Sequence, residues 1–312
     1  MSRLNQDARE QVTFLCEKLC GKNGLKLVDQ DGHFGDLRRL NIHHDTQYDF
    51  ESLNSEAACL DQDPPFLFYP LPQEILNRYP LDPQGFKDGY FFEYNPDIPS
   101  TLKLRIDERT RGACSFVSEW ATRFRPGLPA GTTSLLDIVK LEEISHPNPF
   151  LLESSFFGYY WIPSIYWDTY PSLEPERQDN QYTFSQVTLQ TFQPLVGKED
   201  SILFGEMGAL LSGLKSRVNQ PKVDDEQVQE ALSNDPSMAS DFELAFPDEE
   251  HFPVLMLSYV GPQHGRLFYA YMDGKQLIIQ QSKLYGFEKK STAPVELFAR
   301  MLLSRPLALP DS

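Results

Sequence analysis

The C-terminal part of the chain carries the pattern that most limits its fold. Three runs with the composition and length of β-strands follow one another closely, at Pro253–Val260, Arg266–Met272 and Gln276–Gln281. Gly261–Gly265 links the first two runs, and Asp273-Gly274 between the last two is a signal for a tight hairpin. Because strands joined by links this short pair antiparallel, the sequence predicts a three-stranded antiparallel meander.

A helix should follow the meander, beginning at Ser291 or Thr292, with Pro294 and Glu296 in its first turn. Its apolar residues recur at the spacing of one helix face: Val295, Phe298, Ala299 and Leu302. This stripe has to pack on one face of the sheet. We therefore expect an α+β protein with a predominantly antiparallel sheet, helices packed on one face, and the meander and helix as its most regular unit.

Length and composition favour one large irregular domain over residues 1–312. The chain is 40% hydrophobic and has 22 Phe, 14 Tyr and 3 Trp, which is enough apolar surface for a substantial core and excludes a disordered protein. A sub-boundary would fall near 171–181, which has the composition of a loop. The stretch 219–250 is strongly acidic, with no Lys or Arg after residue 222, and we expect it to be mobile.

The charge of the chain limits its partners. A formal net charge of −17 disfavours nucleic acid and anionic membranes, which both need a concentrated positive field, and leaves a basic protein as a partner for the acidic segments. The longest nearly apolar run, 252–260, is far too short to span a bilayer, and the N-terminal residues lack the apolar core of a signal peptide. We expect a soluble, cytoplasmic protein with free thiols.

A basic island at 101–125 interrupts this acidic chain. Residues 101–107 alternate apolar and charged side chains, which predicts a strand with Lys103 and Arg105 on one face, and a helix is expected over 112–124. The two basic side chains could bind an anionic group of a small-molecule substrate. Alternatively, they pair with acidic segments of the same chain, as most surface charges do.

The stretch 156–170 is the most aromatic part of the chain, with eight aromatic residues in fifteen. It has to be covered, either as core or as the wall of a ligand pocket. In the pocket interpretation, rings stack on a planar, isoprenoid-like or cationic ligand, and two nearby acids, Glu153 and Asp168, are candidate catalytic groups. The candidate substrate-binding residues of the stretch are Tyr159, Trp161, Tyr166 and Trp167.

Other reactive side chains give weaker signals. His264, in the first hairpin link, is a candidate acid or base. Cys114 could be a nucleophile near a helix start, although a small buried thiol explains it better. The His-rich group of residues has no defined ligand spacing, so we expect capping or exposed histidines and no metal or other cofactor. The members of that group are His33, His43, His44 and Asp45.

Two functions remain open from these residues. One is a cofactor-independent transferase, cyclase or isomerase, whose aromatic pocket holds a small organic substrate and whose basic strand binds its anionic group. The other is an acidic, noncatalytic interaction protein that docks a basic partner. The sequence favours the enzyme slightly, because the aromatic and basic features are close in the chain.

Overall fold

The computed structural model of the chain describes residues 2–81, 91, 93–94, 103–144, 158–160, 165–178, 182–223, 225, 227–228, 231–232 and 235–309, without the side chains of 103–105, 158–160 and 236. Its strands are β1 (Ile42–Asp45), β2 (Phe68–Tyr69), β3 (Leu141–Ile144), β4 (Gly158–Tyr160), β5 (Ile165–Pro175), β6 (Val187–Val196), β7 (Val254–Gly261), β8 (His264–Asp273), β9 (Gln276–Gln281), β10 (Tyr285–Gly286) and β11 (Arg305–Pro306). Its longer helices are α1 (Arg3–Leu19), α5 (Lys103–Thr122), α7 (Phe204–Val218) and α9 (Val295–Leu302). Its short helical turns are α2 (Gly21–Gly24), η1 (Arg38–Leu40), η2 (Phe50–Ser52), α3 (Glu56–Leu60), α4 (Gln73–Arg78), α6 (Leu135–Val139) and η4 (Pro236–Asp241).

The α+β class is confirmed, but the sheet is mixed. Its strands lie in the order β1-β9-β8-β7-β6-β5-β3, with β10 beside β8 and β4 beside β5. The three C-terminal strands are antiparallel neighbours in the expected order, whereas β1 runs parallel to β9 and β6 runs parallel to β7. The expectation of a predominantly antiparallel sheet is therefore wrong. Because α7 lies between β6 and β7 in the chain, it gives the crossover that a parallel pair requires.

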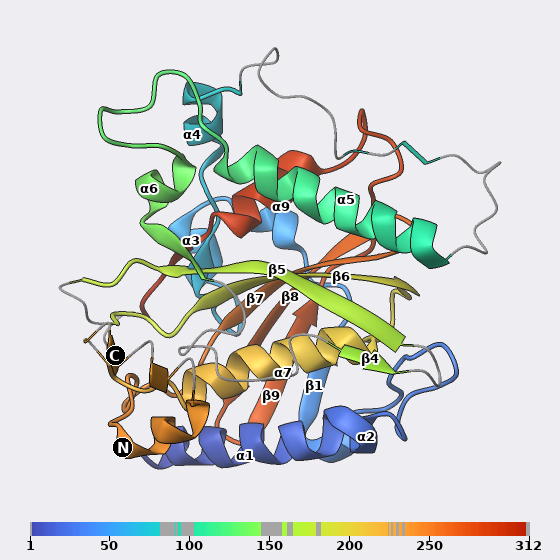
Figure 1. Cartoon of the computed structure of the whole chain (residues 1–312), viewed down its shortest axis with the longest axis vertical. Helices are drawn as coiled ribbons and strands as arrows, with labels where there is room; N and C mark the ends of the chain where they lie inside the picture. Colours follow the sequence, from blue (N-terminus) through green and yellow to red (C-terminus); the bar gives the residue numbers. More distant parts are fainter. Residues whose placement is uncertain are drawn as a thin grey trace.

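Helices cover both faces of the sheet, not one as expected (Figure 1). On one face α1 and α7 pack over a core that contains Phe268 and Met272 of β8. On the other face α5 and α9 pack over a second core that contains Tyr269 and Tyr271 of the same strand. Strands with buried side chains on both faces need a layer on each side, and every residue of β7 is buried.

Residues 103–107 belong to helix α5, so the strand predicted at 101–107 is wrong. Seven residues of alternation fit a strand, but the helical period dominates over the longer segment. Small and apolar residues recur along α5 at one-turn spacing and are buried against the sheet: Thr110, Ala113, Cys114, Val117 and Ala121. Lys103 and Arg105 therefore lie on a helix that crosses the sheet, and their side chains fall outside the described part of the chain.

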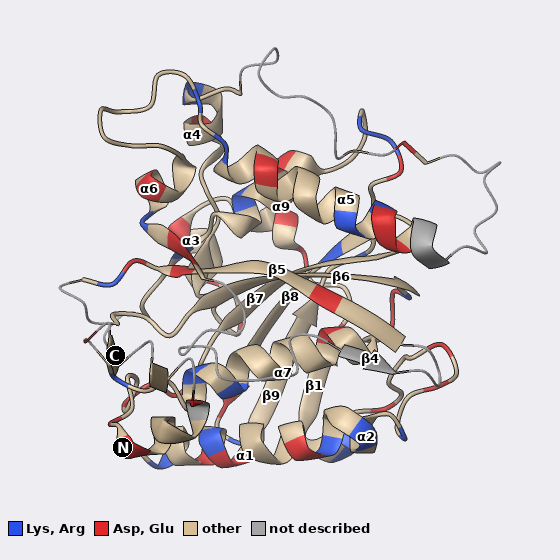
Figure 2. Ribbon diagram, viewed as in Figure 1, with Lys and Arg blue, Asp and Glu red and all other residues tan. Residues whose placement is uncertain are grey.

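Charge is distributed mainly over the helices and loops, while the central strands are largely uncharged (Figure 2). In the acidic stretch 219–250, the described residues Val223 and Leu232 form a small apolar cluster with Tyr182 beside them. None of the helices in the described ranges is long and apolar enough to cross a membrane.

Candidate functional site

Two predicted site residues, Tyr166 and Asp168 of β5, lie beside two residues of α5 in what we call the α5–β5 cluster. The cluster consists of Asp107, Arg111, Tyr166 and Asp168. The Arg111 Nη2 donates to the Tyr166 hydroxyl at 3.3 Å and lies 3.6 Å from Asp107 Oδ2. The Arg111 guanidinium also lies 5.0 Å from the ring centroid of Phe192 on β6. The half-exposed arginine is thus held between two carboxyl groups, an aromatic ring and a phenol.

Burial raises the pKa of both carboxyl groups in the α5–β5 cluster. For Asp168, the backbone N–H of Thr169 at 2.8 Å and the charge of Arg111 oppose this effect without cancelling it. For Asp107, burial is again the main cause, Arg111 opposes it, and the charge of Asp168 raises the pKa further. Each carboxyl group therefore holds its proton to a higher pH than an exposed aspartate does, which is the property of a general acid.

Trp167 belongs to the core and not to a pocket. Successive side chains of a strand point to opposite faces, so Trp167 lies on the α7 side while its neighbours Tyr166 and Asp168 lie on the α5 side. Its side chain is 3% exposed, and its ring is 5.4 Å from the ring of Phe204, centroid to centroid. A Cβ atom added at Gly205 of α7 would lie 2.7 Å from this indole, so the helix approaches it closely.

His264 is not part of the α5–β5 cluster. It begins β8, and β7 and β6 lie between that strand and β5, which corresponds to roughly 14 Å across the sheet. The next residue, Gly265, faces Phe287 and Phe298 on the α9 side of the sheet. His264 therefore faces the opposite side, away from Asp168.

The remaining predicted site residues are placed only in part. Tyr159 lies in β4 directly opposite Tyr166, so the backbone brings these two tyrosines together. The side chain of Tyr159, like those of Lys103 and Arg105, lies outside the described part of the chain. Glu153 and Trp161 lie outside the described residues altogether.

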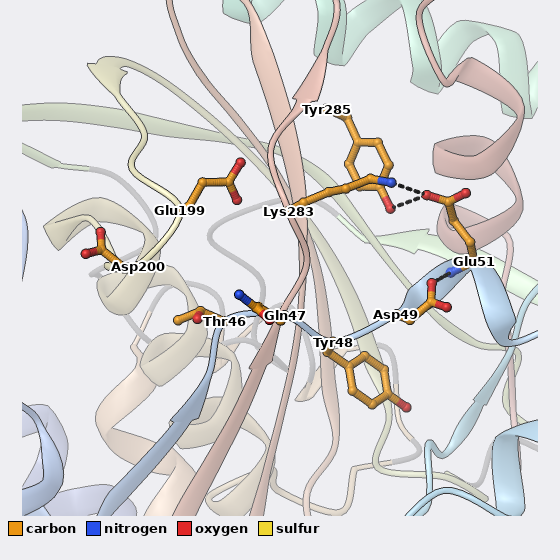
Figure 3. A pocket seen from close by; sticks show the side chains of 9 residues that line it. All are labelled: Thr46, Gln47, Tyr48, Asp49, Glu51, Glu199, Asp200, Lys283 and Tyr285. Carbon is orange, nitrogen blue, oxygen red and sulfur yellow. Dashed lines mark hydrogen bonds and ion pairs between the residues drawn. The ribbon is translucent and has the colours of Figure 1, made fainter.

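A cavity of about 660 Å³, which we call the acidic pocket, lies where three separate segments meet. The segments are the chain from the end of β1 into η2, the turn before α7, and the link from β9 into the start of β10. Four of its lining residues are acidic and one is basic (Figure 3). The pocket is lined by Thr46, Gln47, Tyr48, Asp49, Glu51, Glu199, Asp200, Lys283 and Tyr285.

The lysine of the acidic pocket is already paired. Lys283 Nζ lies 2.8 Å from Glu51 Oε1, and the hydroxyl of Tyr285 donates to the same oxygen at 3.1 Å. The hydrogen bond from Lys283 is the main reason that the pKa of Glu51 is lowered. Figure 3 shows this group on one side of the pocket, with Glu199 and Asp200 on the other. The pocket thus has a clear excess of negative charge.

Buried hydrogen bonds hold the acidic wall of the pocket in place. The side-chain amide of Gln281 donates to the carbonyl of Glu199 at 2.8 Å and pairs with His44 Nε2 at 3.0 Å. Burial is the main reason that the pKa of His44 is lowered, so this imidazole is neutral at pH 7. The Arg266 guanidinium of β8 also donates to the carbonyls of Lys198 and Ser201, at 2.7 and 3.0 Å. Side chains of β8 and β9 therefore fix the backbone of residues 198–201 through hydrogen bonds.

Sequence reasoning missed the acidic pocket, because its residues come from segments more than 80 positions apart in the chain. Asp200 has the sequence signature of a helix N-cap, but α7 begins at Phe204 and Asp200 lines the pocket instead. In the described residues, no group of three or more His, Cys, Asp or Glu side chains is arranged to hold a metal ion.

Comparison with known proteins provides no relative. No protein-family description matches the chain, and no curated protein and no solved structure is significantly similar to it.

Proposed function

We propose that this protein binds a basic partner protein through the acidic pocket. The observation that supports this proposal is the convergence of four carboxylates on one cavity whose lysine is already neutralised by Glu51. A Lys or Arg side chain entering the pocket would meet Glu199 and Asp200 without displacing the Lys283–Glu51 pair. The net charge of −17 adds a long-range attraction that raises the rate of encounter with a basic surface.

The size and lining of the pocket fit a cationic side chain with its backbone. About 660 Å³ is within the range of cavities that bind a drug-sized ligand, which is large enough for one cationic side chain and its backbone. Tyr48 and Tyr285 offer aromatic surface to the aliphatic part of a lysine or to a guanidinium plane. Thr46 and Gln47 supply neutral polar groups between the two charged walls, as Figure 3 shows.

Neutralising Glu199 and Asp200, of which Glu199 accepts only a backbone N–H from Leu284 among the described residues, should weaken this binding. In the double variant Glu199→Gln/Asp200→Asn, we expect the Kd for a Lys/Arg-rich peptide to rise about tenfold or more, because each lost charge contact to a cation is worth on the order of 1 kcal/mol. Isothermal titration calorimetry at low and at 0.3 M salt would measure this effect, and wild-type affinity should fall with salt.

A matched control has the same change in net charge at a distant site. Glu10→Gln/Glu17→Gln removes two exposed charges from α1 and should leave the peptide affinity close to that of the wild type. An equal loss in both double variants would mean that only net charge matters and that the pocket is not the binding site. Failure of the wild type to bind any basic peptide at low salt would refute the proposal.

A second candidate function rests on the α5–β5 cluster. Here the protein would be a cofactor-independent enzyme that acts on a small molecule with an anionic group. Arg111, half-exposed at 52%, would bind that group, and the carboxyl group of Asp168, whose pKa is raised by burial, would act as general acid in an isomerisation or cyclisation. The raised pKa of Asp168 favours this candidate, because it keeps the proton available at higher pH.

The protonation of Asp168 can be tested through stability. When folding raises the pKa of a carboxyl group, that group lowers the free energy of unfolding as the pH rises from its unfolded pKa through its folded pKa. Below the unfolded value of 3.8 the group is protonated in both states and has no such effect. The variant Asp168→Asn should therefore be more stable than the wild type at pH 7 and equal to it at pH 3. Urea unfolding at the two pH values would measure this, with the exposed Asp241→Asn as a control that changes little. A destabilised Asp168→Asn at pH 7 would count against a pKa of Asp168 that is raised by folding.

A further inference from the structure

A hollow of about 160 Å³, which we call the Tyr271 hollow, lies at the end of β8. Tyr269 and Tyr271 line it from the face of the sheet that α5 and α9 cover, and their stacked rings are 5.2 Å apart between centroids. Pro64 and Pro65, from the chain before β2, line it from a second side. Because a cavity of about 150 Å³ is large enough for benzene, this hollow has room for one aromatic ring and little more.

Hydrogen bonds hold the walls of the Tyr271 hollow in place. The Tyr269 hydroxyl donates to the carbonyl of Pro65 at 3.1 Å and accepts from the backbone N–H of Leu67 at 3.3 Å. The carbonyl of Leu67 in turn accepts from the backbone N–H of Leu307 at 3.0 Å. A ligand therefore meets walls that are already ordered, which lowers the entropic cost of binding.

The hydroxyl of Tyr271 is available to a ligand. The residue as a whole is only 5% exposed, but its hydroxyl is not enclosed by protein, and it has no hydrogen-bond partner among the described residues. Burial is the main reason that the pKa of Tyr271 is raised, and the charges of Asp273 and Asp63 raise it further. The group is therefore a neutral phenol at pH 7, which can both donate and accept a hydrogen bond.

His251 brings a hydrogen-bond acceptor to the same hollow. Its ring lies 6.1 Å from the ring of Tyr271, centroid to centroid. Its Nδ1 lies 2.9 Å from the carbonyl oxygen of Met272, which can only accept, so Nδ1 carries the hydrogen. In the neutral imidazole, Nε2 is then an acceptor. Like the Tyr271 hydroxyl, Nε2 is not enclosed and has no partner in the described part of the chain.

The charge around the hollow disfavours an anion. The exposed carboxylate of Asp273 lines it, and no Lys or Arg does so among the described residues. A ligand that carries a carboxylate or phosphate would be repelled by this group. The hollow thus combines flat apolar walls, one fixed acceptor, one hydroxyl and a negative charge.

We propose that the Tyr271 hollow binds a small neutral phenol. The hydroxyl of the ligand donates to His251 Nε2 and accepts from the Tyr271 hydroxyl, while its ring lies against Pro65. Neither contact replaces a hydrogen bond within the described part of the chain, so each adds to the free energy of binding. A free phenol fits better than a tyrosine of a partner protein, because the volume leaves no room for a peptide backbone.

The compound p-cresol is the probe, and two compounds with the same ring and methyl group are its controls. Toluene lacks the hydroxyl, and 4-methylbenzoate has a carboxylate in its place. Titrations followed by NMR should show saturable binding of p-cresol with a Kd on the order of 1 mM, as a ligand this small allows. Toluene should bind about fivefold more weakly or worse, and 4-methylbenzoate should not bind. The signals that p-cresol shifts should include the His251 ring, which the spectrum of His251→Asn identifies.

Two variants remove the polar contacts one at a time. Tyr271→Phe deletes a hydroxyl that has no partner in the described residues, so this variant should fold as the wild type does. His251→Asn keeps a donor for the carbonyl of Met272 and removes the Nε2 acceptor. Each change should raise the Kd of p-cresol about three- to tenfold. His43→Asn changes an exposed histidine of β1 and should leave the Kd unchanged.

The proposal is overturned if p-cresol shows no saturable binding, if toluene binds equally well, or if Tyr271→Phe leaves the Kd unchanged. Binding of a blocked Ala-Tyr-Ala peptide without binding of p-cresol would also overturn it, and would assign the hollow to a partner protein. The hollow shares no lining residue with the acidic pocket, so Glu199→Gln/Asp200→Asn should bind p-cresol as the wild type does. A failure here is therefore distinguishable from a failure of the proposed function.

Discussion

Replacing Glu206 with glutamine is expected to lower the free energy of unfolding by roughly 3–5 kcal/mol, because it leaves the charge of Arg266 buried without its counter-ion. Both side chains are completely buried between α7 and β8. The Arg266 Nε donates to Glu206 Oε1 at 2.8 Å, and its Nη2 pairs with Oε2 of the same carboxylate. Ser258 also donates to Glu206, at 2.7 Å, and the backbone N–H of Leu203 donates to it at 2.8 Å.

A surface pair on another helix is the matched control. Glu119 and Arg123 are one turn apart on α5, 3.7 Å from each other and well exposed. Glu119→Gln should cost less than about 0.5 kcal/mol, because exposed ion pairs contribute little. Urea or thermal unfolding of both variants would measure the contrast. In the double variant Glu206→Gln/Arg266→Met, the loss should be smaller than the sum of the two single losses, since no buried charge is left unpaired. Equal stability of Glu206→Gln and Glu119→Gln would refute this account.

The buried pair also connects the core to the acidic pocket. Arg266 holds the carbonyls of Lys198 and Ser201, on either side of Glu199 and Asp200, two of the four acids that line the pocket. A variant that unpairs Arg266 should therefore weaken binding of a basic peptide as well as stability. The guanidinium group of Arg266 thus contributes both to the stability of the fold and to the backbone geometry of the acidic pocket.

Local patterns in the sequence predict local structure well in this chain. The strand at Gln276–Gln281 has the expected bounds, which depend on the tight turn before it. Helix α9 is present as expected, but it begins at Val295 and not at Ser291 or Thr292, so Pro294 is its N-cap residue and not part of its first turn. The strands β6 and β7 are parallel because the chain between them returns across the sheet as helix α7. The alternation of side chains within either strand does not indicate whether the connection is a hairpin or a crossover helix.

The candidate sites show the same limit. Asp168 and Tyr166 could be selected from the aromatic stretch, but their partners Asp107 and Arg111 could not. The strand expected at 101–107 would have oriented Asp107 differently from helix α5, and Arg111 lay outside both the expected strand and the helix expected over 112–124. The acidic pocket combines three distant segments. Such sites are defined by tertiary structure, and single-sequence patterns contain only their individual residues.

The aromatic stretch makes a second prediction with a large effect. Trp167→Ala should lower the free energy of unfolding by about 3–5 kcal/mol, because the truncated side chain leaves a cavity between β5 and α7 that the backbone at Gly205 cannot fill. The neighbouring change Tyr166→Phe should cost less than about 1.5 kcal/mol, since it removes a hydroxyl that accepts one hydrogen bond from the half-exposed Arg111.

Urea unfolding of the two variants tests, separately for Trp167 and Tyr166, whether the side chain belongs to the core or to a pocket wall. If Trp167 were part of an open pocket wall, its truncation would remove little buried contact and would cost no more than Tyr166→Phe. A large loss for Trp167→Ala with a small loss for Tyr166→Phe would place the indole in the core and leave Tyr166, with Asp168, on the face that is open to a ligand. Successive side chains of β5 point to opposite faces of the sheet. The same aromatic run therefore adds to the core on the α7 face and presents polar side chains on the α5 face.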